Sequence, residues 1–165
     1  MCGIIGYVGG RPCRELILTG LERLEYRGYD SAGFALLAEG EGLVESVRAV
    51  GNLSQLRKSA GPDAASAATA GLGHTRWATH GRVTEANAHP HADESGRFQI
   101  VLNGIVENHA ELRAGLEAEG VRFSSETDAE VVAHLVAKFF DGDLTAAVRK
   151  TCGELRGHFG IVAMA

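Results

Sequence analysis

The chain has 165 residues, 45% hydrophobic and 22% charged, which is typical of a globular domain with one hydrophobic core. Its net charge of −5, without a basic stripe, argues against nucleic acid as a partner. No signal-peptide pattern and no apolar stretch of the roughly 18 residues that span a membrane is present. Three cysteines without a CxxC pair fit a reducing compartment, so we expect a cytoplasmic protein that does not contact a membrane.

The first half of the chain predicts mostly strands. An apolar, β-branched run at Cys2–Val8 ends at a glycine pair and predicts a buried strand. The elements expected after it are a helix from Pro12 to Leu24, a loop over 27–31, a strand pair at 33–38 and 43–50, a helix at 52–59 capped by Asn52, a loop over 60–70 and a strand at 71–78.

The second half predicts mostly helices. Residues 79–96 have no apolar period and form a long loop, which in a compact domain is often functional. The elements expected after it are a strand at 98–102 ending in an Asn103–Gly104 turn, a helix at 108–119, a helix opened by a capping box at Thr127–Glu130 and reaching Phe139, a helix at 144–155 and a strand at 157–165. This pattern predicts an α/β protein with sheets and helices in layers.

Cys2 is the most informative single residue. Removal of the initiator methionine would leave Cys2 with a free α-amine, whose ordinary pKa is near 8, beside a thiol whose pKa is near 8.5. One residue could then supply both a nucleophile and its base, without a separate catalytic histidine. For Cys13 and Cys152, in helical segments, we expect small buried hydrophobic side chains.

Several blocks, in order along the whole chain, resemble the class II glutamine amidotransferases. The chain begins Cys2-Gly3-Ile4-Ile5-Gly6, as these enzymes do. The later blocks resemble the branch of glutamine–fructose-6-phosphate aminotransferase (isomerizing), also called glucosamine-6-phosphate synthase: Leu24–Gly33 (LEYRGYDSAG), His74–Gly81 (HTRWATHG), Asn87–His91 (NAHPH), Asn103–His109 (NGIVENH) and Ser125–Val131 (SETDAEV).

The resemblance implies a fold, a reaction and a domain. The fold is α/β (α+β), the N-terminal nucleophile hydrolase four-layer αββα sandwich of two antiparallel sheets. The reaction is hydrolysis of L-glutamine to L-glutamate and ammonia without a cofactor or metal. Residues 1–165 would be the glutaminase domain, incomplete at its C-terminus. The sugar-isomerase half, which binds fructose 6-phosphate and uses the ammonia to make glucosamine 6-phosphate, is absent, and the full-length protein would be a homodimer.

The resemblance also implies residue roles. Cys2 would attack the side-chain amide, while Asn103 and the backbone N–H of Gly104 hold the oxyanion. The expected substrate-binding residues are Arg76 for the α-carboxylate, helped by Thr79 and His80, with Asp128 for the α-ammonium and Trp77 closing the pocket. These roles suit the chemistry, because a zwitterion needs one fixed cation and one fixed anion. Leu102 departs from the family, since many relatives carry histidine there.

Each of these residues also has a structural interpretation. Arg76 could be a surface ion-pair partner, Asp128 a charge that only complements a helix dipole, and Trp77 core packing. Asn103–Gly104 alone predicts a type I′ hairpin turn. Tyr26, Arg27 and Asp30 could shape the pocket wall or only brace a turn. Zinc is disfavoured because no HExxH or paired cysteine spacing accompanies the candidate ligands His74, His80, His89 and His91.

Other functions remain open from sequence. The chain could be the glutaminase domain of another class II enzyme, such as amidophosphoribosyltransferase, asparagine synthetase or glutamate synthase. It could be a glutamine-binding module that releases no ammonia. A purely structural protein is disfavoured by the density of matching polar blocks.

Overall fold

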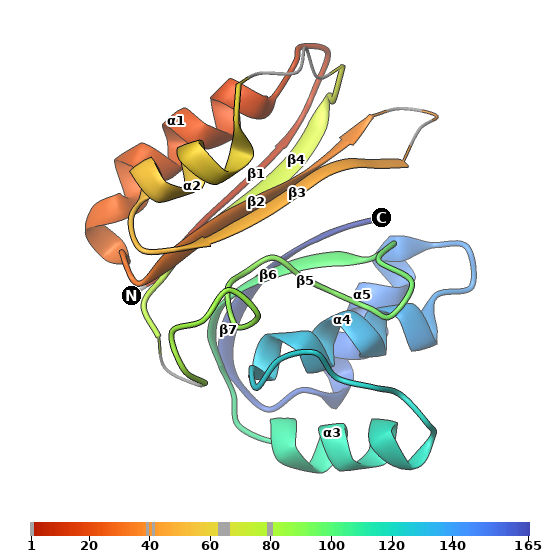
Figure 1. Cartoon of the computed structure of the whole chain (residues 1–165). Helices are drawn as coiled ribbons and strands as arrows, with labels where there is room; N and C mark the ends of the chain where they lie inside the picture. Colours follow the sequence, from red (N-terminus) through yellow and green to blue (C-terminus); the bar gives the residue numbers. More distant parts are fainter. Residues whose placement is uncertain (1, 39, 41, 63–66, 79–80) are drawn as a thin grey trace.

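A computed structural model describes residues 2–38, 40, 42–62, 67–78 and 81–165 of the chain. Two antiparallel sheets face each other, and helices cover the outer side of each sheet (Figure 1). This arrangement is the four-layer sandwich expected from the resemblance.

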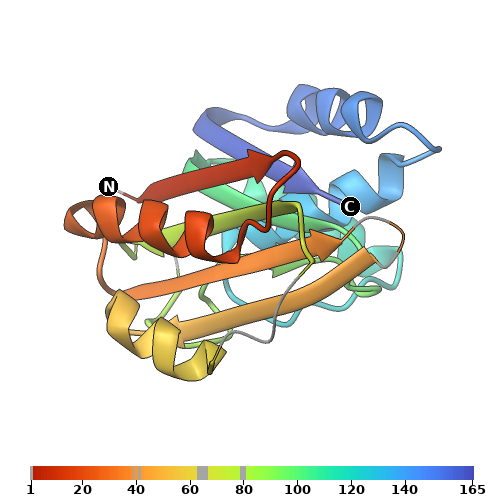
Figure 2. The same cartoon turned by 90° about the horizontal axis from the view of Figure 1, so that it is seen from above.

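The first sheet has four strands, and two helices lie over its outer face (Figure 2). In spatial order the strands are β1 (Gly3–Val8), β4 (Ala70–Arg76), β2 (Ser31–Ala38) and β3 (Gly42–Val50). The covering helices are α1 (Arg14–Leu24) and α2 (Leu53–Ala60), with a 3-10 turn η1 (Glu25–Arg27) after α1.

Strand β2 is buried on both faces of its sheet. Alternate residues of a strand point to opposite sides, so successive residues of β2 belong to different clusters. Phe34 and Leu36 pack toward the helices in a cluster that includes Ile17. Ala35 instead belongs to a smaller cluster between the two sheets, with Val101 of the facing sheet. Burial on both faces explains the continuous apolar run at this strand.

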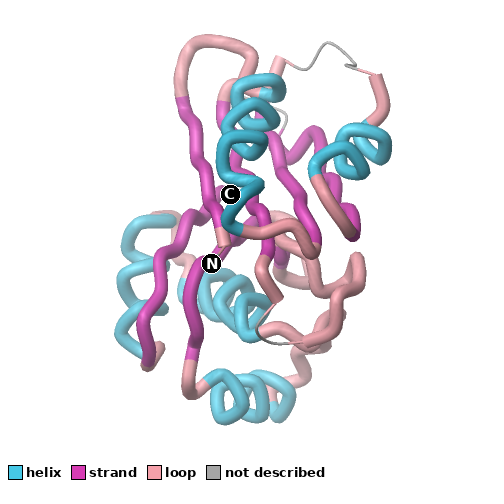
Figure 3. The backbone as a smooth tube through the Cα atoms, turned by 90° about the vertical axis from the view of Figure 1, so that its left-hand side faces the viewer, coloured by secondary structure: helices cyan, strands magenta, loops and turns pink. Residues whose placement is uncertain are grey.

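The second sheet has three strands, and the remaining helices lie on its outer side (Figure 3). The strands are β5 (His91–Ala92), β6 (Gln99–Val106) and β7 (Gly157–Met164), in that spatial order. The helices are α3 (His109–Ala118), α4 (Asp128–Phe139) and α5 (Leu144–Glu154).

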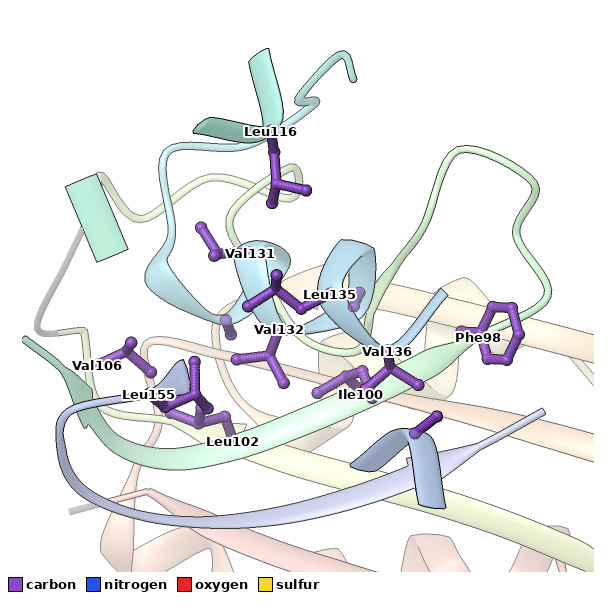
Figure 4. Packing of buried hydrophobic residues seen from close by; sticks show 13 residues of the cluster. Phe98, Ile100, Leu102, Val106, Leu116, Val131, Val132, Leu135, Val136 and Leu155 are labelled. Carbon is purple, nitrogen blue, oxygen red and sulfur yellow. The ribbon is translucent and has the colours of Figure 1, made fainter. Parts of the chain in front are cut away.

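The largest core lies between α4 and β6. Val132 and Val136 of α4 point toward Ile100 and Leu102 of β6 (Figure 4). Ile100 is fully buried, so its truncation to alanine is expected to cost about 2–5 kcal/mol. This packing lays α4 along β6, so that the start of α4 lies beside the end of β6.

The predicted strands and helices are confirmed, with most boundaries shifted by one or two residues. The loop predicted over 79–96 is wrong at its end, because His91–Ala92 pair with β6 as strand β5. The predicted turn at Asn103–Gly104 is wrong: both residues lie inside β6, opposite Gly160 and Phe159 of β7. The type I′ hairpin is wrong for the same reason. The partner strand comes from a distant part of the chain, which a local turn pattern cannot reveal.

The structure differs from the sequence prediction at two helix caps. Asn52 is the N-cap residue of α2, but its side chain caps nothing, and the Leu53 N–H donates instead to Glu25 at 2.8 Å. At α4 the capping box is wrong. Glu130 turns away from the N-cap residue and accepts hydrogen bonds from the backbone N–H groups of Ser124 and Ser125, each at 2.7 Å.

The cysteines other than Cys2 lie in different environments. Cys13 is buried in the cluster beneath α1, as predicted. Cys152 is exposed on α5, so the prediction of a buried side chain is wrong there. Within the described ranges, no helix is both long enough and apolar enough to cross a membrane.

Candidate active site

Four elements bring the candidate residues together at one end of the sandwich. Cys2 directly precedes β1, and Arg76 ends β4, the strand that pairs with β1 so that Gly3 lies opposite Thr75. Asn103 and Gly104 come from β6 of the facing sheet, and Asp128 begins α4. The cleft between them is lined by Cys2, Arg76, Trp77, His89, Leu102, Gly104, Thr127 and Asp128.

The Cys2 thiol is half-buried and lies against the backbone of Trp77. The Trp77 N–H donates to the Cys2 Sγ at 3.3 Å, and the Sγ lies 3.5 Å from the Trp77 carbonyl oxygen. Burial raises the pKa of the Cys2 thiol, and the Trp77 N–H and Arg76 oppose that rise only in part. The thiol therefore needs a base to become a nucleophile near neutral pH.

Asn103 and Gly104 lie close to Cys2 from the opposite sheet. The Asn103 Nδ2 donates to the Cys2 carbonyl oxygen at 3.0 Å. Gly104 has φ of 132°, and a Cβ there would lie 2.1 Å from the His158 carbonyl oxygen. Only glycine suits this position, which lets the strand backbone pass along the cleft wall.

Arg76 is a buried cation in the cleft wall. Its exposed fraction is 3%, so the interpretation as a surface ion-pair partner is wrong. Its guanidinium donates to the carbonyl oxygens of Arg82 at 3.1 Å and Gly81 at 3.3 Å. Burial lowers its pKa, while Cys2, Asp30 and Asp128 oppose the change, and an arginine remains charged in proteins.

Asp128 provides a buried anion across the cleft. It is 5% exposed, and its Oδ2 accepts a hydrogen bond from the Val106 N–H at 2.8 Å. This bond fixes the carboxylate to β6, and no described residue donates a hydrogen bond to its other oxygen. Asp128 therefore does more than complement the helix dipole, although it occupies the first position of α4.

Trp77 stands at the rim of the cleft. Its side chain is 46% exposed and packs edge-on against Tyr29, with ring centroids 5.7 Å apart. Core packing is therefore the wrong interpretation, and the position suits a side chain that covers a pocket. Thr79 and His80, the other two candidate binding residues, lie outside the described residues.

The 26–30 loop braces the site from outside. Asp30 accepts a hydrogen bond from the Ala78 N–H at 2.9 Å, and its own N–H donates to the Arg76 carbonyl oxygen at 3.1 Å. Tyr26 is exposed and accepts from the Arg27 Nε. Asp30 therefore supports the turn after β4, as expected of a residue that braces a turn.

A stack of buried histidines lies behind the cleft. His89 stacks on His74, with ring centroids 4.0 Å apart, and meets His91 edge-on at 4.6 Å. His74 donates to the Leu102 carbonyl oxygen at 3.0 Å, and His91 bonds the Thr127 hydroxyl at 2.9 Å. Among the described residues, no three or more His, Cys, Asp or Glu side chains are placed to hold a metal ion.

His89 and Thr127 line the cleft, although the sequence predicts a role in binding glutamine for neither of them. Neither ring nitrogen of His89 has a hydrogen-bond partner within the described part of the chain. Burial holds the pKa of His89 well below 6.5, so the ring is neutral and can both donate and accept. The only sequence signal was its place in the Asn87–His91 block.

Comparison with known proteins decides the family. The family model described as a glutamine amidotransferase domain matches residues 40–161. This chain belongs to that family.

Several curated relatives of this family member share one name. The glutamine–fructose-6-phosphate aminotransferases [isomerizing] of Symbiobacterium thermophilum and Aquifex aeolicus are 54% and 52% identical to it over 164 residues, or 99% of this chain. That of Streptomyces coelicolor is 54% identical over 166 residues. The chain spans only 26–27% of the length of these relatives.

Solved structures of this amidotransferase fold agree with the architecture. The glutamine phosphoribosylpyrophosphate amidotransferase of B. subtilis, complexed with ADP and GMP, superimposes with a TM-score of 0.79 at 22% identity. A structure described as the allosteric regulatory enzyme of purine biosynthesis gives 0.80 at 24% identity. Each match covers 98% of this chain and 35% of the other, and confirms the N-terminal nucleophile hydrolase fold.

Proposed function

We propose that this chain hydrolyses L-glutamine to L-glutamate and ammonia through a thioester on Cys2. The observation that carries the proposal is the placement of the Cys2 thiol in one cleft with a buried cation, Arg76, and a buried anion, Asp128. A free α-amino acid carries one charge of each sign at its α-carbon. The two buried charges therefore match those of an amino acid whose side chain reaches Cys2.

The first step forms the thioester. After removal of Met1, the α-amine of Cys2, directly or through a water, takes the thiol proton. The thiolate attacks the amide carbon, giving a tetrahedral oxyanion. One hydrogen of the Asn103 amide and the Gly104 N–H stabilise that charge, each contributing roughly 3–4 kcal/mol in comparable sites. Collapse breaks the carbon–nitrogen bond, and the leaving nitrogen takes the proton and departs as ammonia.

The second step returns the free enzyme. Water, deprotonated by the same amine, attacks the thioester carbonyl, and a second oxyanion forms in the same place. Its collapse breaks the carbon–sulfur bond, releases L-glutamate and restores the thiol. Arg76 and Asp128 hold the α-carboxylate and α-ammonium throughout, with Thr79 and His80 assisting Arg76 and Trp77 covering the pocket.

We further propose that residues 1–165 are the glutaminase part of a longer glutamine–fructose-6-phosphate aminotransferase (isomerizing). The name of the curated relatives and their identity of about one half support this assignment. In that protein a sugar-isomerase half would bind fructose 6-phosphate and convert it to glucosamine 6-phosphate with the ammonia. We expect that protein to be a cytoplasmic homodimer.

The test is Cys2→Ala, assayed for ammonia release and for glutamine binding by calorimetry. The proposal expects ammonia release to be lost while binding stays within about threefold of the wild-type value, because Arg76 and Asp128 are intact. Cys152→Ser is the matched control, since that thiol is exposed on α5. Ammonia release by Cys2→Ala at the wild-type rate would refute the mechanism, and binding without ammonia release by the wild-type chain would indicate a binding module.

A further inference from the structure

Two residues outside the cleft lining, Asn87 and Glu126, form two hydrogen bonds with each other. The Asn87 side-chain amide bonds both the backbone N–H and the carboxylate of Glu126. The Glu126 backbone N–H donates to the Asn87 Oδ1 at 2.8 Å, and the Asn87 Nδ2 donates to the Glu126 Oε2 at 2.9 Å. Asn87 is 2% exposed, so this pairing is shielded on the asparagine side. We call the pair the 87–126 clamp.

The clamp holds the backbone of Arg82 from both sides. The Arg82 N–H donates to the Glu126 Oε2 at 3.2 Å, and the Arg82 carbonyl oxygen accepts from the Asn87 Nδ2 at 3.0 Å. The hydrogen bonds from Asn87 and from the Arg82 N–H lower the pKa of Glu126, so its carboxylate is ionised near neutral pH. Ionised acceptors make the stronger hydrogen bonds.

Close packing at Gly81 fits the same arrangement. Gly81 has φ of +76°, and a Cβ there would lie 2.8 Å from the Asn87 Nδ2 and 3.2 Å from the Glu126 Cβ. Only glycine allows the backbone at this point to lie directly on the clamp.

The clamp connects the two charged ends of the cleft. On one side, the carbonyl oxygens of Gly81 and Arg82 accept hydrogen bonds from the guanidinium of Arg76. On the other side, Glu126 lies two residues before Asp128 in the chain. A shift of the clamp would therefore change the position of the cation relative to the anion.

We propose that Asn87 and Glu126 are positioning residues that set the separation between Arg76 and Asp128, and thereby select substrates that carry both an α-carboxylate and an α-ammonium. This inference rests on the proposed glutamine hydrolysis. It assigns neither residue a contact with the substrate. A misplacement of about 1 Å at such a site can lower catalysis on the order of 100-fold.

The experiment compares three amides: L-glutamine, 4-aminobutanamide, which lacks the α-carboxylate, and glutaramic acid, which lacks the α-amine. In Asn87→Ala we expect kcat/KM for glutamine to fall about 10- to 100-fold through KM, with little change for the two one-ended amides. The preference for glutamine then shrinks. A variant that is merely unstable would lose activity toward all three amides equally.

Two further variants make the result specific. Glu126→Gln changes an exposed side chain, so it should fold, and it keeps an acceptor for Arg82 and Asn87; most of the preference should remain. Glu126→Ala, which removes that acceptor, should lose the preference for glutamine. Asn108→Ala is the matched control, because Asn108 also bridges two backbone groups, those of Glu154 and Arg156, and is not among the cleft-lining residues, so it should leave the preference unchanged.

The outcomes separate the two proposals. If glutamine and both one-ended amides lose kcat/KM equally in Asn87→Ala, or if the preference is unchanged, the clamp has no positioning role. If the wild-type chain releases no ammonia, the proposed function fails. In that case the inference is tested by binding, through the dissociation constants of the same three amides. It is overturned if Asn87→Ala keeps the wild-type binding preference or if the wild type does not bind glutamine.

Discussion

The side-chain amide of Asn103 donates a hydrogen bond to the backbone carbonyl oxygen of Cys2 at 3.0 Å, although 101 residues separate them in the chain. This bond joins the two facing sheets at the proposed nucleophile. Because the amide carries two hydrogens, one can hold Cys2 in place while the other is directed at a developing oxyanion.

Replacing Asn103 by alanine should therefore lower kcat by about 10²–10³, with a much smaller change in KM. The amide stabilises a charge that exists only in the transition state, and this produces such a split. Asn103→Asp keeps the shape but removes both donors, so it should be impaired to at least the same extent. Steady-state ammonia release checks both variants, and a kcat within about threefold of wild type would remove Asn103 from the oxyanion site.

Substitutions of Asp128 should separate its two roles. Asp128→Asn keeps an oxygen that can accept from the Val106 N–H but loses the charge that would bind the α-ammonium, so KM for glutamine should rise about tenfold or more. Asp128→Ala also leaves a buried N–H without its acceptor, which costs about 1–3 kcal/mol of stability. Thermal unfolding and glutamine titration measure the two effects. Equal stability of the Asn and Ala variants would contradict the structural role.

The three cysteines should react with a thiol reagent in a fixed order. Cys152 is exposed and should be modified first; Cys13 is buried and should react only on unfolding. Cys2 is intermediate in exposure, and because burial raises the pKa of its thiol, it should react slowly. In Cys152→Ser a single slow thiol should remain, and prior treatment with a glutamine-like diazoketone should block it. Rapid labelling of native Cys13 would contradict the packing beneath α1.

Stability should decrease in mild acid because of the buried histidine stack. Burial lowers the pKa of His74 and of His91 from 6.5 to about 3, and that of His89 falls well below 6.5. The unfolded chain therefore binds more protons below pH 6.5, so the stability from neutral burial is complete above that pH and is lost as the pH falls. Each ring lowers the free energy of unfolding by up to about 1.4 kcal/mol for each pH unit of acidification.

Urea unfolding at pH 7.5, 6 and 5 checks this expectation. The free energy of unfolding should fall from the first condition to the last, and His91→Gln should reduce the slope because one buried imidazole is gone. Glu130 adds a separate effect at lower pH: His134 and the hydrogen bonds from Ser125 and Ser124 outweigh burial and lower its pKa from 4.5. A stability independent of pH between 7.5 and 5 would contradict neutral burial of the stack.

The sequence alone determined those properties that depend on short segments. Apolar periodicity located the strands and helices, such as β1 and α4, because their spacing depends on local backbone geometry. The proposal that Cys2 is a nucleophile followed from a thiol beside an amine. The charged pair Arg76 and Asp128 was identified by blocks that resemble the family, and the cleft contains both.

Only the tertiary structure decided what depends on distant neighbours. Asn103–Gly104 reads locally as a turn, but pairing with β7, more than fifty residues later, extends the strand through it. Glu130 lies where a capping box needs it, yet its carboxylate binds the preceding loop. The place of His89 in the cleft wall, the exposure of Cys152 and the 87–126 clamp likewise depend on contacts between segments far apart in sequence, because local propensity carries no information about which segments pack together.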